Sequence, residues 1–314
     1  MPIVPLPGGV WSATPTPLTS SFQVDDVSVH RMVARHVEMG VKGIMLGGTC
    51  GEGPWLADRD RERLTRTTAD AAAGRLHIAL QVTDNSAARV LANIDRAAAW
   101  GAEIAMVAAP YVFLNATPQR LLAHFRDIAR ESCLTVGLYD GGEALAVPEP
   151  YLPELLAESK IAMVKDSSSL DSRLRAYVAA HRQRPEILLL NGDEFNCVRC
   201  LQAGYDGLLL GGAVFNGYLA ASIIKAAQGG DWAGAEKLQA RMNDLMYRVY
   251  GGPTIECWLS GLKEMLVALG VFSTRANLLG YPLTETCREQ IHAALNGADG
   301  LGYRADLLGA AIGK

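Results

Sequence analysis

Eight short apolar runs, spaced along the first two thirds of the chain, constrain its fold more than any other feature of the sequence. Their starts lie about 20 to 35 residues apart, which leaves room for a strand, a helix and two turns. The runs are apolar throughout, as in strands that are covered on both faces. They span 9–14, 43–46, 76–82, 103–109, 134–139, 161–164, 186–190 and 207–210. Eight such units predict an α/β protein with a (β/α)8 TIM barrel.

Amphipathic segments between the apolar runs predict the helices that surround this barrel. They span 31–39, 57–73, 87–100 and 118–132. Asp58 is a candidate N-cap for the second of them, and Pro118 suits the first turn of the fourth.

About 100 residues follow the eighth run, which is more than one closing helix needs. Helices are expected there at 219–228, 232–250, 255–269 and 284–295, with glycine-containing breaks between them. The aromatic residues of this tail are typical of helix packing or of a subunit contact: Trp232, Tyr247, Tyr250 and Trp258. We therefore expect a barrel core at 1–214 and C-terminal helices at 215–314, packed on the barrel.

Composition and charge narrow the possible partners and the cellular location. Of the 314 residues, 49% are hydrophobic and 20% are charged, which is typical of a globular protein with a sizeable core. The formal charge of −4 and the mixing of arginines with acidic residues leave no basic stripe for nucleic acid. The N-terminus lacks the pattern of a signal peptide, and no apolar stretch is long enough to span a bilayer. We expect a cytoplasmic protein with neither nucleic acid nor membrane as a partner.

The six cysteines are irregularly spaced and are expected to be free thiols. Only Cys197 and Cys200 have the spacing of metal ligands, and no second pair completes a zinc site. We expect no metal.

Lys165 is the strongest candidate nucleophile. Active groups of such barrels lie at the carboxyl ends of the strands, and Lys165 directly follows the sixth apolar run. Lysine is scarce here, with seven lysines against twenty-two arginines. Partial desolvation at that place favours the neutral amine, which attacks carbonyl carbons. From the local pattern alone, an ion pair with a carboxylate such as that of the neighbouring Asp166 stays open as the alternative interpretation.

Two further features lie at strand ends of the predicted barrel. Tyr139 ends the fifth run, next to the strand of Lys165, so its phenol is placed either to relay protons or to pack at the rim. The stretch GGTCGEGPW at 47–55 follows the second run and offers backbone N–H groups and the Thr49 hydroxyl to a carboxylate. It lacks the GK[ST] ending of a phosphate-binding P-loop. Glu52 in this loop is expected to hold backbone amides in place.

Six motifs recur in a characteristic order: GTCGE at 48–52, PY at 110–111, LY at 138–139, VKDSS at 164–168, GDE at 192–194 and GGAVFNG at 211–217. Together they resemble the dihydrodipicolinate synthase/N-acetylneuraminate lyase family of Schiff-base-forming barrel enzymes. The resemblance implies that Lys165 forms a Schiff base with pyruvate or a longer 2-oxo acid and that Tyr139 relays protons. It also implies that Thr49 is a catalytic residue.

The resemblance further implies how the substrate is bound and how the protein is assembled. The residues expected to bind the substrate lie in the loops after the second and eighth runs: Gly48, Thr49, Cys50, Gly211, Gly212 and Ala213. Tyr111 is implied at a subunit interface or in the proton relay. No cofactor is implied, and relatives are commonly homo-oligomers, so a dimer or tetramer is expected.

The sequence also departs from the pattern of the synthases. No arginine lies between Tyr139 and Arg173, where a synthase holds its second substrate, and Val112 replaces the second tyrosine of the relay. Cys50 replaces the second threonine of the loop. The length of the segment from Tyr139 to Lys165 is more similar to branches that act on deoxy sugar acids.

These features lead to three hypotheses about function. The first is a lyase that performs aldol cleavage, aldol condensation or dehydration of a 2-keto-3-deoxy sugar acid or a related compound. The second is a 4-hydroxy-tetrahydrodipicolinate synthase, which condenses pyruvate with aspartate semialdehyde. The third, kept open by Val112, is a 2-oxo acid sensor without catalytic activity.

Overall fold

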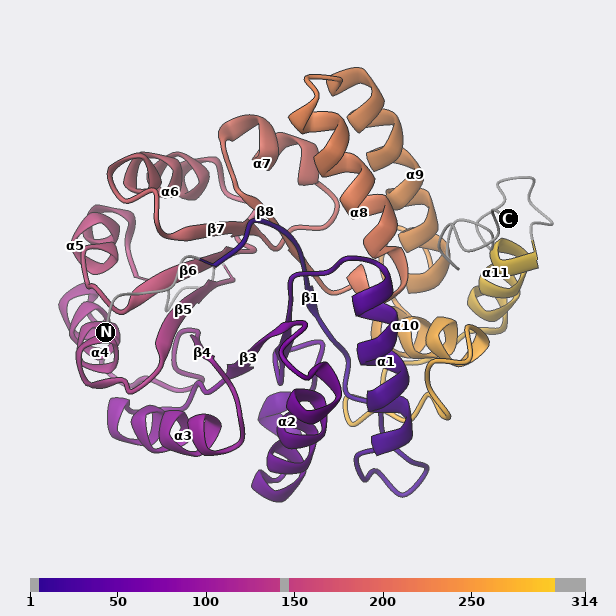
Figure 1. Cartoon of the computed structure of the whole chain (residues 1–314), viewed down its shortest axis with the longest axis horizontal. Coiled ribbons are helices and arrows are strands. Elements are labelled where there is room, and N and C mark those ends of the chain that lie inside the picture. Colours follow the sequence, from indigo (N-terminus) through magenta and orange to yellow (C-terminus); the bar gives the residue numbers. More distant parts are fainter. Residues whose placement is uncertain (1–5, 142–146, 297–314) are drawn as a thin grey trace.

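The computed structural model describes residues 6–141 and 147–296, and its eight parallel strands close into a barrel in sequence order (Figure 1). The strands are β1 (Gly9–Ala13), β2 (Gly43–Leu46), β3 (His77–Gln81), β4 (Ile104–Val107), β5 (Thr135–Asp140), β6 (Ile161–Asp166), β7 (Leu188–Asn191) and β8 (Gly207–Leu210). Each lies in one of the eight predicted runs or overlaps it. The predicted TIM barrel is confirmed. Strands β5, β6 and β7 continue past the apolar runs into polar residues.

The interior of the barrel is filled by side chains from the strands. These are Trp11, Ala13, Met45, Ala79, Ile104, Met106, Met163, Leu188, Leu190 and Leu209. Trp11 is fully buried, and a Cβ atom on Gly43 would lie 2.2 Å from its ring, so the indole takes the space of a side chain on β2. Because this interior is packed and is no channel, a substrate site has to lie at a rim of the barrel.

Helices α1 to α8 of the described residues surround the barrel (Figure 1). They are α1 (Asp26–Glu38), α2 (Asp58–Ala72), α3 (Ala87–Ala99), α4 (Pro118–Glu131), α5 (Leu152–Leu156), α6 (Asp171–Gln183), α7 (Cys197–Ala203) and α8 (Ala213–Gln228). The first begins before the predicted residue 31, because the Asp25 carboxylate caps it by accepting the Ser28 N–H at 3.3 Å. The prediction that Asp58 caps α2 is wrong: Ala57 is the N-cap, and Asp58 is the first helical residue.

Three more helices, α9 (Trp232–Tyr250), α10 (Trp258–Ala268) and α11 (Glu285–Asn296), gather on the side of the barrel where α8 and α1 lie (Figure 1). They share an apolar cluster with α8 that includes Phe215, Met246 and Leu262. Helix α8 starts directly after β8 and crosses the predicted boundary at residue 214, and the division into 1–214 and 215–314 stays a prediction. Residues 297–314 of the predicted tail lie outside the described residues.

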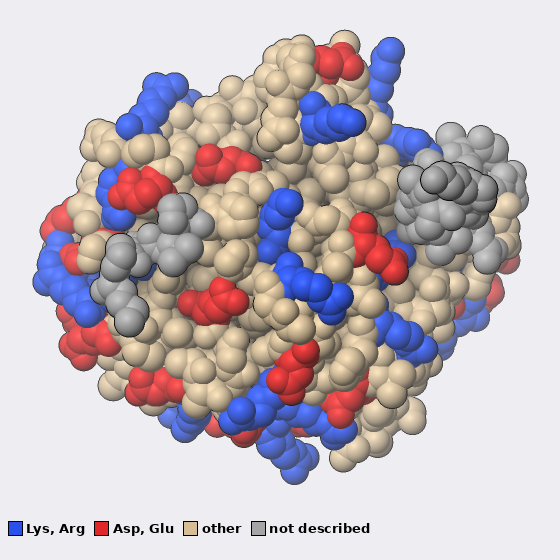
Figure 2. All heavy atoms as spheres, in the orientation of Figure 1, with Lys and Arg blue, Asp and Glu red and all other residues tan. Residues whose placement is uncertain are grey.

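The described helices include none that is long and apolar enough to cross a membrane. On the face shown in Figure 2, basic and acidic side chains are interspersed. The absence of a nucleic-acid partner stays a prediction.

Candidate active site

Lys165 and Tyr139 lie side by side near the carboxyl ends of β6 and β5, where they are register partners. The Lys165 Nζ lies 4.2 Å from the centroid of the Tyr139 ring. The lysine is 7% exposed and the tyrosine is partly exposed, so the pair lines the rim and is still largely removed from water. An ammonium at this distance over an aromatic face is attracted to it. The predicted nucleophile and the predicted proton relay are therefore brought together.

The lysine stem packs against the backbone of Gly192, which follows β7. A Cβ atom on Gly192 would lie 2.9 Å from Lys165 Cε and 1.9 Å from Ser167 Oγ, so a side chain does not fit there. The Ser167 Oγ is buried and has no hydrogen-bond partner among the described residues. Because a buried hydroxyl without a partner is costly, this atom marks a place for a polar ligand or a water molecule. From the sequence, Ser167 was recognised only as part of the VKDSS motif.

Asp166 does not pair with Lys165, so that interpretation is wrong. Its Oδ2 accepts a hydrogen bond from the Tyr205 hydroxyl at 2.6 Å. Its Oδ1 accepts from the Ser168 N–H at 2.9 Å and from the Ser168 hydroxyl at 2.6 Å. Successive side chains of a strand point to opposite faces, so Lys165 is directed to the barrel mouth while Asp166 is directed to the surrounding helices.

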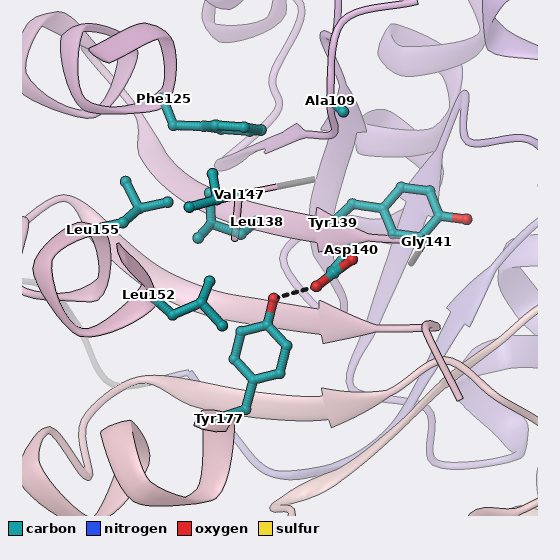
Figure 3. A pocket seen from close by; sticks show the side chains of 10 residues that line it. All are labelled: Ala109, Phe125, Leu138, Tyr139, Asp140, Gly141, Val147, Leu152, Leu155 and Tyr177. Atoms are coloured by element: carbon teal, nitrogen blue, oxygen red, sulfur yellow. Dashed lines mark hydrogen bonds between the residues drawn. The ribbon is translucent and has the colours of Figure 1, made fainter. Parts of the chain in front are cut away.

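Asp140 follows Tyr139 on β5, and its side chain, like that of Asp166, is directed to the surrounding helices. Its Oδ2 accepts from the Tyr177 hydroxyl at 2.6 Å and lies 3.1 Å from Arg173 Nη1. In Figure 3, Asp140 meets Tyr177 beside a group of apolar side chains, and the Tyr139 ring points away from that group. Burial, with the nearby Asp140 charge, raises the pKa of Tyr177 well above its usual value, so this phenol remains a donor.

Arg173 is the first arginine after Tyr139 in the sequence, and it lies behind the strand. Its Nη1 donates to the Val147 carbonyl at 2.5 Å, in addition to its ion pair with Asp140. The guanidinium is thus engaged on the helix side of β5, away from the side on which Tyr139 faces Lys165. The segment after Tyr139 includes 142–146, which lie outside the described residues.

The loop after β2 is tightly coiled, as its glycines predict. The Glu52 N–H donates to the Thr49 carbonyl at 3.1 Å, and the Gly53 N–H donates to the Gly48 carbonyl at 3.2 Å. A Cβ atom on Gly53 would overlap the Gly47 carbonyl oxygen at 1.8 Å. Within this loop Gly48 is buried and Thr49 is exposed. Their substrate contacts stay predictions.

Glu52 anchors this loop to the C-terminal helices. Its carboxylate is fully buried, pairs with Lys263 Nζ of α10 and accepts the Leu278 N–H. Lys263 also donates to the Ala276 carbonyl at 2.6 Å. Glu52 has φ 58°, in the left-handed region that side chains rarely adopt, so these contacts help hold an unfavourable backbone conformation. The expected structural role of Glu52 agrees with these contacts, whereas the role of Lys263 was missed.

Gly211, in the loop after β8, lies close to the side chains of both Cys50 and Glu194. A Cβ atom on Gly211 would lie 3.8 Å from Cys50 Sγ, and 3.8 and 3.9 Å from the two Glu194 carboxylate oxygens. The Glu194 Oε2 accepts the Gly212 N–H at 2.7 Å, and Oε1 accepts the hydroxyl of Tyr250 in α9 at 2.8 Å. The N–H of Gly212, a residue expected to bind the substrate, therefore already has a carboxylate partner within the protein.

Sequence reasoning treated Tyr250 as a packing residue and quoted Glu194 only within a motif. The substrate contacts of Gly211, Gly212 and Ala213 stay predictions, and Ala213 is fully buried at the start of α8.

Burial raises the pKa of the two acidic groups near Gly211, the Cys50 thiol and the Glu194 carboxyl. It raises the pKa of the Cys50 thiol well above its usual value; the Glu194 charge adds to this shift and Lys165 opposes it. Burial also raises the pKa of Glu194, against the hydrogen bonds from Gly212 and Tyr250 and the charge of Lys165. The Cys50 side chain is therefore a neutral thiol near neutral pH, which is a weak hydrogen-bond donor.

Replacing Cys50 with threonine tests whether that thiol shapes the pocket. If Cys50 binds substrate only through its backbone N–H, Cys50→Thr is expected to change the Kd for pyruvate less than about threefold, since volume is nearly kept. Pyruvate titration followed by calorimetry measures this. A shift of tenfold or more, about 1.4 kcal/mol, would show that the thiol itself contacts the ligand.

Tyr111 lies in the loop after β4 and is 49% exposed, next to the exposed side chains of Val112 and Leu114. Tyr111 lines a pocket of about 250 Å³ together with Arg61 and Gln81. Exposed apolar side chains close to a site suit a subunit contact. The interface or relay role of Tyr111 stays a prediction.

Cys197 and Cys200 lie in α7, and both are buried. Within 6–141 and 147–296, no three His, Cys, Asp or Glu side chains are grouped so that they could hold a metal ion.

Comparison with known proteins gives a consistent assignment. A model of the Dihydrodipicolinate synthetase family matches residues 6–298. The 4-hydroxy-tetrahydrodipicolinate synthase of Kineococcus radiotolerans is 31% identical over 289 residues, which are 91% of this chain and 90% of that protein. YagE is an E. coli K12 prophage protein of the dihydrodipicolinic acid synthase family, and its structure was solved with pyruvate. It superposes on this chain with a TM-score of 0.81 at 22% identity, covering 93% of this chain and 98% of YagE. CdNal of Clostridium difficile, solved with mannosamine, gives a TM-score of 0.80 at 17% identity, covering 91% and 97% of the two chains. The two structural likenesses show a shared fold.

Proposed function

The chain belongs to the dihydrodipicolinate synthetase family, and we propose that it is a cofactor-free lyase that uses Lys165 to form a Schiff base with pyruvate or a longer 2-oxo acid. Members of this family are class I aldolase-type lyases, which form such a Schiff base with pyruvate. The observation that carries the proposal is the Lys165 Nζ, 4.2 Å from the centre of the Tyr139 ring at the rim of the barrel.

In the proposed reaction, the neutral Nζ of Lys165 attacks C2 of the 2-oxo acid, and loss of water gives an iminium ion. In an aldol cleavage, the C4 hydroxyl loses its proton, the C3–C4 bond breaks, and its electron pair moves to the iminium to form an enamine. In a dehydration, C3 loses a proton and the enamine then expels the C4 hydroxyl as water. Tyr139 carries the proton to and from the substrate oxygen. The loop with Gly48, Thr49 and Cys50 holds the substrate carboxylate.

We favour a 2-keto-3-deoxy sugar acid or a related compound as the substrate. The support is that Arg173 is engaged behind β5, so it is not placed to hold a second carboxylate as the synthase reaction requires. The runner-up is 4-hydroxy-tetrahydrodipicolinate synthase, the printed activity of the relative from Kineococcus radiotolerans. A cytoplasmic homo-oligomer, dimer or tetramer, is part of the proposal.

Trapping with borohydride tests the Schiff base directly. Incubation with pyruvate and borohydride, followed by digestion and mass spectrometry, is expected to place the added mass on the peptide that contains Lys165. Protein treated with borohydride alone serves as the control. Pyruvate-dependent mass on another lysine, or on none, would sink the proposed mechanism.

Substrate screens then separate the three hypotheses. A panel of 2-oxo acids and deoxy sugar acids is expected to yield a turned-over sugar acid, and appreciable condensation of pyruvate with aspartate semialdehyde would favour the synthase instead. A sensor would return its ligand unaltered after long incubation while the ligand raises the thermal unfolding midpoint.

A further inference from the structure

We propose that Asp140 and Asp166 are positioning residues of the candidate active site. Each carboxylate is bonded to a buried tyrosine outside the barrel, and this bond holds the strand end that carries Tyr139 or Lys165 in the geometry that the reaction needs. The inference rests on the proposed function, because Lys165 and Tyr139 are the reacting groups there. It adds two residues that act on the reaction only through the groups beside them.

The two aspartates lie directly behind the two reacting groups. Asp140 and Asp166 are the last residues of β5 and β6, immediately after Tyr139 and Lys165. They are register partners, as Tyr139 and Lys165 are, and both are buried. The last pairing between β5 and β6 is therefore the pairing of the aspartates. Because the ends of an element open more readily than its middle, the contacts of these last side chains decide how firmly the strand ends are held.

Tyr205 ties Asp166 to the layer of helices. The Tyr205 hydroxyl donates to Asp166 Oδ2 at 2.6 Å. Tyr205 lies between α7 and β8, is 5% exposed and belongs to the apolar core between the barrel and its helices. The other oxygen, Oδ1, accepts the Ser168 N–H at 2.9 Å and the Ser168 hydroxyl at 2.6 Å. Both oxygens of the carboxylate are thus held, one by the chain just after β6 and one by a distant element.

Tyr177 ties Asp140 to α6 in the same manner. The Tyr177 hydroxyl donates to Asp140 Oδ2 at 2.6 Å, and Arg173 Nη1 lies 3.1 Å from that oxygen. Both partners belong to α6 and are buried. Figure 3 shows the bond between Tyr177 and Asp140 beside the strand that carries Tyr139. The end of β5 is therefore fixed to one helix by two contacts.

The two phenols remain donors near neutral pH. Burial raises the pKa of Tyr177 and of Tyr205 above the usual value, and the charge of the bonded aspartate adds to each shift. The charge of Asp166 also raises the pKa of Tyr177, so the two pairs are close enough to act on each other. Both rings lie in the same apolar core cluster. The two strand ends are thus held to one packed layer.

Such restraints matter because two groups have to meet one substrate. The Lys165 Nζ lies at the end of a long side chain, 4.2 Å from the centre of the Tyr139 ring. A displacement of about 1 Å in a reacting group can slow a reaction about 100-fold. The substrate carboxylate is proposed to bind elsewhere, at the loop after β2. A shift of the ends of β5 and β6 is therefore expected to slow iminium formation more than it weakens the binding of pyruvate.

The test uses Tyr205→Phe and Tyr177→Phe, which each remove one hydroxyl and keep the ring in the core. Protein is mixed with pyruvate and quenched with borohydride after increasing times, and the mass of the peptide with Lys165 gives the rate of iminium formation. At saturating pyruvate, this rate is expected to fall about tenfold or more in each variant. The pyruvate concentration that gives half of the maximal rate is expected to change less than about threefold.

Val178→Ala is the matched control for a loss of stability alone. Val178 follows Tyr177 in α6 and packs in the same apolar core cluster, but it is bonded to neither aspartate through its side chain. Removing its methyl groups lowers the thermal unfolding midpoint. The rate of iminium formation at saturating pyruvate should stay at the wild-type value.

Variants of Asp166 test whether the bond to Tyr205 is the cause. Asp166→Asn keeps an oxygen that accepts the Tyr205 hydroxyl, so it should retain more of the rate than Asp166→Ala. Adding Tyr205→Phe to Asp166→Ala should lower the rate no further, because the partner is already absent. Equal rates in the asparagine and alanine variants, or a further loss in the double variant, would contradict the inference.

The outcomes are distinguishable from a failure of the proposed function. Wild-type protein without a pyruvate adduct on Lys165 refutes the function itself. A wild-type adduct, together with wild-type rates in both tyrosine variants or an equal loss in Val178→Ala, refutes the inference alone. If one tyrosine variant does not fold, the other carries the test, since each tyrosine is bonded to its own aspartate.

Discussion

Lys165→Arg is expected to lower kcat/KM by about 10⁴-fold or more and to abolish borohydride trapping with pyruvate. Arginine keeps the positive charge and most of the length, but a guanidinium is not deprotonated in a protein and cannot act as the neutral nucleophile. The measurement is turnover of the best substrate from the screen, together with the mass of the trapped protein.

The matched control for this variant is Lys160→Arg. Lys160 precedes β6 at the opposite end of the same strand from Lys165, so an identical change is made away from the candidate site. It should keep wild-type turnover and trapping. Thermal unfolding of both variants checks that the barrel is intact. Trapping that persists in Lys165→Arg would mean that another amine is the nucleophile.

Lys263→Met is expected to lower the free energy of unfolding by about 3–5 kcal/mol, because it leaves the Glu52 carboxylate buried without its cation. Both side chains of this pair are fully buried. Their charges act on the pKa of the Cys50 thiol, which belongs to the same loop as Glu52. The loop after β2 should therefore lose its conformation as well, which raises KM for the 2-oxo acid. Urea unfolding and steady-state kinetics measure the two effects.

Two further variants show whether the buried pair causes these losses. Lys225→Met, at an exposed lysine in the last turn of α8, should change stability by less than about 0.5 kcal/mol. Combining Glu52→Gln with Lys263→Met should cost less than the sum of the single changes, because no unpaired charge remains. Additive losses, or a stable Lys263→Met protein with normal KM, would show that the pair does not hold the loop.

The strands were predictable because a closed parallel barrel covers both faces of every strand. Continuous apolar runs therefore marked the strands, and only their polar ends were missed, as at Lys165 and Asp166 of β6. Helix starts were less predictable. The first helix begins at Asp26 because the Asp25 side chain caps it, and the sequence before residue 31 lacks a strong apolar pattern.

Candidate site residues were predictable where their place in the site follows from their position at the end of their own strand. Lys165 and Tyr139 are set at strand ends by the runs before them, and neighbouring strands bring them together. The partners of Glu194 and Glu52 were not predictable, since Tyr250 lies 56 residues and Lys263 lies 211 residues further along the chain. Nothing near those tyrosine and lysine residues in the sequence distinguishes them from ordinary helix residues.

The sequence by itself determined the barrel and the rim at which the candidate catalytic residues lie. Strands that are buried on both faces form continuous apolar runs, and the residues that follow such a run lie at the carboxyl end of the strand. The tertiary structure alone decided which charges meet there. It directed Asp166 to the outside of the barrel, placed Glu194 beside the glycines of the loop after β8, and paired Glu52 with Lys263. Such pairings depend on how distant elements pack in space, and a charged residue's own neighbours in the chain carry no information about its partner.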